Sequence, residues 1–248
     1  MNSKILKLDD DKFEFIIIHT KLSPHPHHLS ITIKNTIFTP ATHVKNLGVI
    51  QDSCLTMEKQ VNTILRSCYC NIRTIGKIRR YITTDACKTL VQAMVTSRLD
   101  YANILLDGLP QSLLGRMQRL QNTAARLITR TPRRNHITPV LIDLHWLPVE
   151  YRPRYKVLLY TYKALNGLAP AYLRDLLEQY HPTRSLRSAS KLLLKVPSQR
   201  TVTYGSRSFR MSAAVQWNSL PNHLKHASSI GTFKKLLKTY LFKLAYSL

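Results

Sequence analysis

The stretch TMEKQVNTILRSCYCNIRTIGKI, residues 56–78, decides the fold. Its apolar side chains return at steps of three and four, the spacing that places them on one face of an α-helix. A helix with a single apolar stripe must bury that stripe against other elements, so this stretch predicts a bundle of helices. The stripe consists of Val61, Ile64, Leu65, Cys68, Ile72, Ile75 and Ile78.

The helical period continues towards the carboxyl terminus. Thr83 or Thr84 is expected to cap a helix that Gly108-Leu109-Pro110 ends, and another helix is expected from Ser112 to about Arg130. Residues 183–204 predict a loop and a small hairpin. The remaining helices are expected to start near Pro139 and Pro148, to end at Gly167, to restart at Pro170, and to cover about 209–217 and 232–244.

The period before Thr56 is two, which is typical of strands. Residues 13–18 and 29–34 alternate in this way, and the Pro/His-rich residues 23–28 between them predict a turn. Residues 43–50 are interpreted as the returning partner of the second strand. The expected fold class is therefore α+β, mainly α, with a small antiparallel β-hairpin or sheet at the amino terminus followed by helices.

The chain is strongly basic. Its 37 Lys+Arg and 13 Asp+Glu leave a formal charge of +24, and the imbalance grows along the 248 residues. Residues 1–50 hold 6 basic and 4 acidic side chains, residues 51–135 hold 14 and 5, and residues 136–248 hold 17 and 4. Such a field favours a polyanion, most simply a nucleic acid, as partner. The alternatives are a habitat like that of the mitochondrial ribosome, or a chain under no selection for solubility.

One helix carries the clearest basic ridge. Around residues 112–130, arginines recur at spacings of three, seven and four, which lines them up along the side opposite the apolar stripe. We expect these side chains and the two that follow to contact phosphates without reading sequence; the alternative is a solvated helix face. The set is Arg116, Arg119, Arg126, Arg130, Arg133 and Arg134.

A second segment mixes aromatic and basic side chains. Tyr151, Arg152, Arg154, Tyr155 and Lys156 alternate as stacking surfaces for bases do. Tyr155 also falls on the apolar stripe of its helix, so core packing is an equally good interpretation.

The residues predict no catalytic or metal site. Asp9, Asp10 and Asp11 follow no apolar strand that would aim them at divalent ions, so a two-metal site is disfavoured. The histidines near residue 25 and the four cysteines lack the spacing of zinc ligands. The sequence also lacks the Gly-x-Ser-x-Gly element of hydrolases and Gly-rich phosphate loops. We therefore expect no cofactor and no small-molecule substrate.

Several blocks of the chain resemble the carboxyl-terminal part of reverse transcriptases from LINE-type, non-LTR retrotransposons. NSKILKLDDDKFEFIII is similar to the block after the Asp-Asp box of that family, and VKNLGVIQDSCLTMEKQV to the block that follows it. The further blocks that resemble the family, in its order, are TSRLDYANILLDGLP, LQNTAARLITR, LHWLPVEYRPRYKVLLYTYKALNGLAPAYLRDLL, TYGSRSFRMSAAVQWNSLP and TFKKLLKTYLF.

The resemblance implies roles for two residues. Lys12 matches a lysine that the family places near the incoming triphosphate, although Phe13 stands where threonine is usual. Gly48, in Leu47-Gly48-Val49, matches the hairpin that grips the primer terminus, where glycine lets a nucleic-acid backbone approach closely. The alternative is a hairpin retained without function.

The resemblance also implies what is missing. The family's metal-binding carboxylates lie upstream of the matching segment, so we expect the chain to begin within the palm and to be inactive as a polymerase. It implies a partial palm at residues 1–50, a helical thumb-like region at 51–135 and a basic helical carboxyl-terminal region at 136–248.

The expected function is that of a truncated RNA-directed DNA polymerase that binds RNA, DNA or their hybrid without sequence preference. The alternative is an inert or protein-interaction-only remnant of a decayed retroelement.

The location is expected to be intracellular, in the nucleus or the cytoplasm. Asp9 to Asp11 and Glu14 surround the first apolar stretch, the reverse of a secretory signal. Apolar runs such as residues 15–18 are far shorter than the roughly 20 residues of a membrane span. Four cysteines without a regular framework favour reduced thiols.

Overall fold

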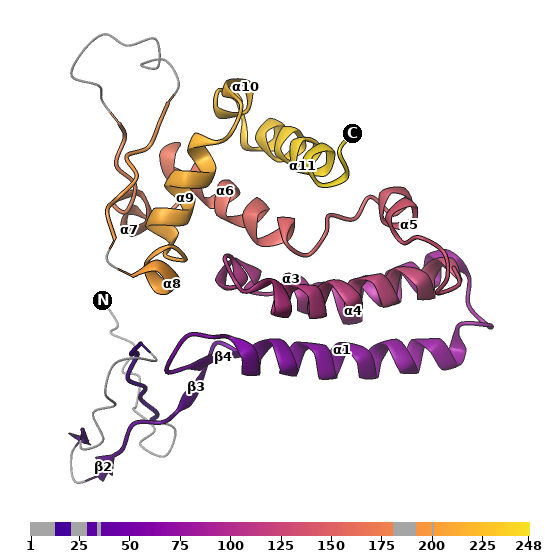
Figure 1. Cartoon of the computed structure of the whole chain (residues 1–248), viewed down its shortest axis with the longest axis horizontal. Helices are drawn as coiled ribbons and strands as arrows, with labels where there is room; N and C mark the ends of the chain where they lie inside the picture. Colours follow the sequence, from indigo (N-terminus) through magenta and orange to yellow (C-terminus); the bar gives the residue numbers. More distant parts are fainter. Residues whose placement is uncertain (1–12, 21–28, 34–35, 181–191, 200) are drawn as a thin grey trace, which may run out of the picture. The chain divides into compact units, whose positions relative to one another are not determined.

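The computed structural model describes residues 13–20, 29–33, 36–180, 192–199 and 201–248. The chain divides into two compact units, Met1–Thr63 and Ile64–Leu248. Two small antiparallel hairpins precede a series of helices (Figure 1), which confirms the predicted α+β, mainly α class.

The described residues of the first unit form two separate hairpins. Strand β1 (Ile31–Ile33) pairs with β2 (Thr36–Phe38), and β3 (His43–Asn46) pairs with β4 (Val49–Asp52). The prediction that residues 43–50 return as the partner of residues 29–34 is therefore wrong. The tight turn at Leu47 and Gly48 has φ of 46° and 80°, so it folds this stretch back on itself.

The predicted strand at residues 13–18 is also wrong, because this stretch forms no ladder. Phe15 and His19 instead make isolated backbone hydrogen bonds to other segments. Ala41 N donates to Phe15 O at 2.9 Å, and His19 N donates to Ser53 O at 3.0 Å. The alternating pattern serves packing: the Phe13 and Phe38 rings meet edge to face, with centroids 4.9 Å apart.

Asp52 connects the second hairpin to helix α1 (Glu58–Ile78). Its carboxylate accepts hydrogen bonds from the backbone nitrogens of Cys54, Thr56 and Met57 at 3.2, 2.9 and 2.8 Å, and from Thr56 Oγ1 at 3.1 Å. Burial raises the pKa of this carboxyl, but the four donors together hold it below its ordinary value. The charged form of Asp52 therefore fixes the chain where the helix begins.

The helices of the first half follow the predicted stripes. Thr83 caps α2 (Thr84–Val91) by accepting a bond from Ala86 N at 3.2 Å, as expected. A π-helical turn, η2 (Gln92–Thr96), separates α2 from α3 (Ser97–Asp100), which the sequence predicted as one helix. A short 3₁₀ turn, η3 (Asn103–Leu106), then leads to α4 (Gln111–Thr129).

Arg79 holds the ends of these helices together although only 8% of its surface is exposed. Its Nε donates to Leu127 O at 2.9 Å and its Nη2 to Ile128 O at 2.7 Å, which satisfies carbonyls of the last turn of α4. Nη1 donates to Ile82 O at 3.0 Å, and Nη2 also reaches Thr84 Oγ1 at 3.3 Å. One guanidinium therefore joins the end of α1, the start of α2 and the end of α4.

The helices in the described residues of the second half are α5 (Thr138–Asp143), α6 (Tyr151–Leu165), α7 (Ala171–Arg174), α8 (Val202–Gly205), α9 (Phe209–Asn218), α10 (Asn222–Lys225) and α11 (Ile230–Tyr246).

Most of the helix starts and ends predicted for this half are confirmed. Gly167, with φ of 69°, follows α6, and Pro139 lies in the first turn of α5. The predicted hairpin within residues 183–204 is wrong for the described part, because Leu194 bridges back to Gln179 and α8 follows. Residues 181–191 lie outside the described residues. The sequence missed α10, which is a single turn after Pro221.

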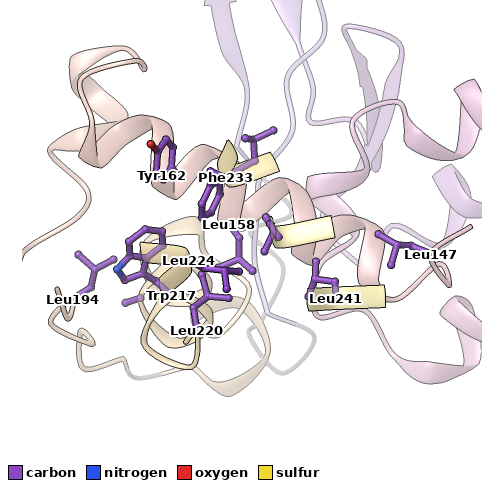
Figure 2. Close-up of a cluster of buried hydrophobic side chains, with 12 residues drawn as sticks. Leu147, Leu158, Tyr162, Leu194, Trp217, Leu220, Leu224, Phe233 and Leu241 are labelled. Atoms are coloured by element: carbon purple, nitrogen blue, oxygen red, sulfur yellow. The ribbon is translucent and has the colours of Figure 1, made fainter. Parts of the chain in front are cut away.

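A buried cluster holds the second half together (Figure 2). Tyr162 of α6 stacks on Phe233 of α11, with ring centroids 4.2 Å apart, and its hydroxyl donates to Ala227 O at 2.8 Å. Trp217 of α9 is 1% exposed and donates through its indole nitrogen to Leu192 O at 2.8 Å. Tyr155 packs against this cluster, so its core interpretation is the one observed.

Among the helices of the described residues, none combines the length and the apolar character needed to cross a bilayer.

The Asp52 contacts predict an acid-sensitive start of α1. Because its folded pKa is lowered, the ionised carboxyl stabilises the fold above about pH 4, its unfolded pKa, and this stabilisation is lost as the pH falls through the lower folded value. In Asp52→Asn, the protection factors for amide hydrogen exchange at residues 54–57 should be lower at pH 6, and the fall of these protection factors on acidification should largely disappear. Equal protection in the variant and the parent protein at pH 6 would contradict this role.

The Arg79 contacts predict a sharp difference between two neighbouring arginines. Arg79→Met should lower the free energy of unfolding by about 2 kcal/mol or more, because it leaves buried carbonyls without donors. Arg80→Met, at an exposed position, should change it by about 0.5 kcal/mol at most. Urea unfolding followed by circular dichroism measures both, and equal effects would show that Arg79 carries no special weight.

Candidate nucleic-acid interface

The structure divides the predicted arginine ridge into two kinds of side chain. Arg119 is exposed on α4 and Arg116 is half-buried. Arg126 and Arg130, by contrast, hydrogen-bond to backbone carbonyls. The ridge is therefore partly a structural element and partly available surface.

Arg126 shapes the loop that follows α4. Its guanidinium donates to Pro132 O, and its Nη2 donates to Asn135 O at 2.7 Å. These two bonds tie both ends of the loop to the helix, and the two arginines between them, Arg133 and Arg134, are exposed. Arg126 thus positions this pair of cations.

Arg130 brings a second basic segment to the same place. It ends α4 in a left-handed conformation, with φ of 57°, and its Nη2 donates to Arg79 O at 3.1 Å. Because Arg79 bonds back to the α4 carbonyls, the end of α1 and the end of α4 meet here. We call the cations around this meeting point the basic junction: Lys77, Arg80, Arg130, Arg133 and Arg134.

One feature of the basic junction was not predicted from the sequence. The guanidinium of Arg80 lies 4.6 Å from the ring centroid of Tyr81, and Tyr81 is 72% exposed. An exposed aromatic ring beside exposed cations is the combination that stacks on unpaired bases. The sequence pattern that could have predicted this feature is Arg80-Tyr81, which lies between two predicted helices, where the chain has to turn at the surface.

A basic stripe on α1 was missed as well. Arg66, Arg73 and Lys77 are exposed, and at 100° per residue they lie within about 40° of one another. They face away from the apolar stripe of the same helix. Their spacing of seven and four could have been found by the reasoning that found the α4 ridge.

The sequence around the basic junction holds few acids. No Asp or Glu occurs between Glu58 and Asp85, or between Asp107 and Asp143. The six basic residues of the first stretch and the six of the second therefore face no carboxylate on their own segments. Their field adds up where the two helix ends meet.

The two residues singled out by the resemblance alone belong to the first unit, Met1–Thr63. Gly48 lies at the tip of the β3–β4 hairpin, beside the 84% exposed Leu47, in the first unit. Lys12 lies outside the described residues.

Other reactive groups form no site in the described part of the chain. No three His, Cys, Asp or Glu side chains gather there as metal ligands would; Asp9, Asp10 and Asp11 lie outside it. All four cysteines are free thiols. Burial raises the pKa of Cys68 to about 11 and also raises that of Cys87, so these two are held as neutral thiols at physiological pH.

Comparisons of the chain with protein-family models, with curated protein sequences and with solved structures give no match.

The Arg126 contacts predict that this residue protects the loop at 131–135. In Arg126→Ala, trypsin should cut after Arg133 or Arg134 several times faster than in the parent protein, because the loop loses the two bonds that close it. Arg119→Ala is the matched control, since Arg119 lies on the same face of α4 and is exposed. Mass spectrometry of timed digests measures the rates, and equal rates in both variants would contradict the positioning role.

Proposed function

We propose that this chain binds nucleic acid through its phosphate backbone, without sequence preference, at the basic junction. The observation that carries the proposal is the meeting of two acid-free helix ends through the bonds between Arg79, Leu127, Ile128 and Arg130. A cluster of this kind releases condensed counterions from a polyanion, and this release is the main source of non-specific affinity.

The composition of the junction favours nucleic acid over other polyanions. Four of its five cations are arginines, whose planar guanidinium matches phosphate oxygens in a bidentate fork. Tyr81 adds an exposed ring on which a base can stack. Single strands and hybrids with accessible bases should therefore bind at least as well as duplex DNA.

The proposal agrees with the resemblance to non-LTR reverse transcriptases. In that interpretation the residues of this chain contribute contact with the template and primer backbone rather than chemistry. RNA, DNA and their hybrid are all proposed ligands.

Salt dependence is the decisive measurement. Fluorescence anisotropy with a 20-nucleotide RNA, the matching RNA–DNA hybrid and duplex DNA should show log affinity falling linearly with log salt, by about 0.9 per phosphate contacted on duplex DNA. Arg80→Gln/Arg133→Gln/Arg134→Gln should weaken binding and reduce this slope by roughly 2 to 3. Ligands of unrelated sequence should differ by far less than the roughly 10³-fold typical of specific recognition.

A control with the same change in net charge separates the junction from charge in general. Lys234→Gln/Lys235→Gln/Lys243→Gln removes three exposed cations from α11 and should leave the slope nearly unchanged. Equal flattening in both triple variants would place binding on the whole basic surface instead. Absence of salt-sensitive binding in the parent protein would favour the inert or interaction-only remnant.

A further inference from the structure

A cavity of about 430 Å³ lies where α3, α6 and α11 come together. This volume falls in the range of small-ligand sites, about 300–1,000 Å³. The polar side chains on its wall come from four parts of the chain: Gln92, Thr96, Asp100 and Asn103 in residues 92–103, His145 after α5, Arg152, Tyr155 and Lys156 on α6, and Lys238 on α11.

The single acid in the wall of this cavity is neutralised. Both carboxylate oxygens of Asp100 accept bonds from Arg152 Nη1, at 2.9 and 3.0 Å, and Asn103 Nδ2 donates to one of them at 3.2 Å. Arg152 Nε donates to Leu147 O at 3.0 Å. The ion pair is partly buried, and the hydrogen bonds to Asn103 and Leu147 hold it in place. It therefore forms a rigid part of the cavity wall that carries no net charge.

Two lysines remain unneutralised. Lys156 lies one helical turn beyond Arg152, and Lys238 belongs to α11, which packs on α6. Neither has a carboxylate partner among the described residues, and Nη2 of Arg152 has no hydrogen-bond acceptor among them. The two lysines therefore give the wall a net charge of about +2, and Thr96 and Asn103 add neutral hydrogen-bond donors.

We propose that this cavity binds a phosphomonoester, the terminal phosphate of a nucleotide. Such a group carries a charge of about −1.5 to −2 at neutral pH and three acceptor oxygens, which matches two lysines and the spare guanidinium nitrogen. The diester phosphates within a strand carry one charge each and lack the third terminal oxygen. The phosphate comes either from a free mononucleotide or from the 5′ end of a strand.

This inference goes beyond the basic junction. It uses different helices and different side chains, and it concerns the end of a nucleic acid or its monomer rather than the backbone. Either proposal can therefore fail without the other.

The test is calorimetric titration of the whole chain with adenosine 5′-monophosphate, inorganic phosphate and adenosine. The two phosphates should bind and adenosine should not. Lys156→Ala/Lys238→Ala should weaken phosphate binding at least about tenfold, the effect of losing one charge-assisted hydrogen bond. Lys156→Arg/Lys238→Arg should retain most of it, which shows that the site depends on the cations.

Lys163→Ala/Lys235→Ala is the matched control, because it removes one lysine from each of the same two helices outside the cavity. Comparing a 5′-phosphorylated strand with its 5′-hydroxyl form distinguishes the sources: a strand end predicts tighter binding of the phosphorylated form, lost in Lys156→Ala/Lys238→Ala, whereas a free nucleotide predicts equal binding. The junction variant Arg80→Gln/Arg133→Gln/Arg134→Gln should keep the affinity for adenosine 5′-monophosphate. Equal loss in the control, or binding of adenosine as tight as that of its phosphate, would overturn the proposal.

Discussion

The second unit depends on one buried cation, Arg79, and on the carbonyl groups that surround it. A buried charge is tolerated only when its donors are satisfied, and here carbonyls of the last turn of α4 and of the α1–α2 turn do this without any carboxylate. The α4 carbonyls among them, Leu127 O and Ile128 O, lie at the negative end of the α4 dipole. Because the guanidinium lies inside, the chain has to turn at the surface directly after it, which exposes Arg80 and Tyr81.

Arginines that the sequence does not distinguish have different roles in the structure. Arg79 and Arg126 bond to carbonyl oxygens, and Arg152 to Asp100 and to a carbonyl. These side chains set the path of the backbone, and their charges are largely committed. Arg133 and Arg134 lie in a loop whose shape Arg126 fixes, so their charge faces solvent and is available to a ligand. The net charge of +24 therefore overstates the charge that can bind a partner.

Polar contacts between helices give the second half a defined geometry around its apolar core. Gln121 Nε2 donates to Leu147 O at 2.8 Å, and Val149 N donates to Gln118 Oε1 at 2.8 Å, so α4 fixes the segment that leads into α6. The side chain of Asn218 bonds to both backbone groups of Leu194, at 2.8 Å each. Bonds of this kind specify one arrangement of helices, which apolar contacts alone leave adjustable. The cavity between α3, α6 and α11 is a result of that arrangement.

The sequence by itself determined the features that depend on near neighbours in the chain: the stripe of α1, the Thr83 cap, the Gly167 stop and the α+β, mainly α class. These follow from spacings of three or four residues and from local backbone preference. Only the structure decided the strand pairing, because two successive residues with positive φ, Leu47 and Gly48, turn this stretch back on itself in place of the expected pairing with residues 29–34. It also decided that Arg79 is buried while Arg80 is exposed, and that Lys156 and Lys238 share one cavity, since burial depends on which elements meet and not on residue type.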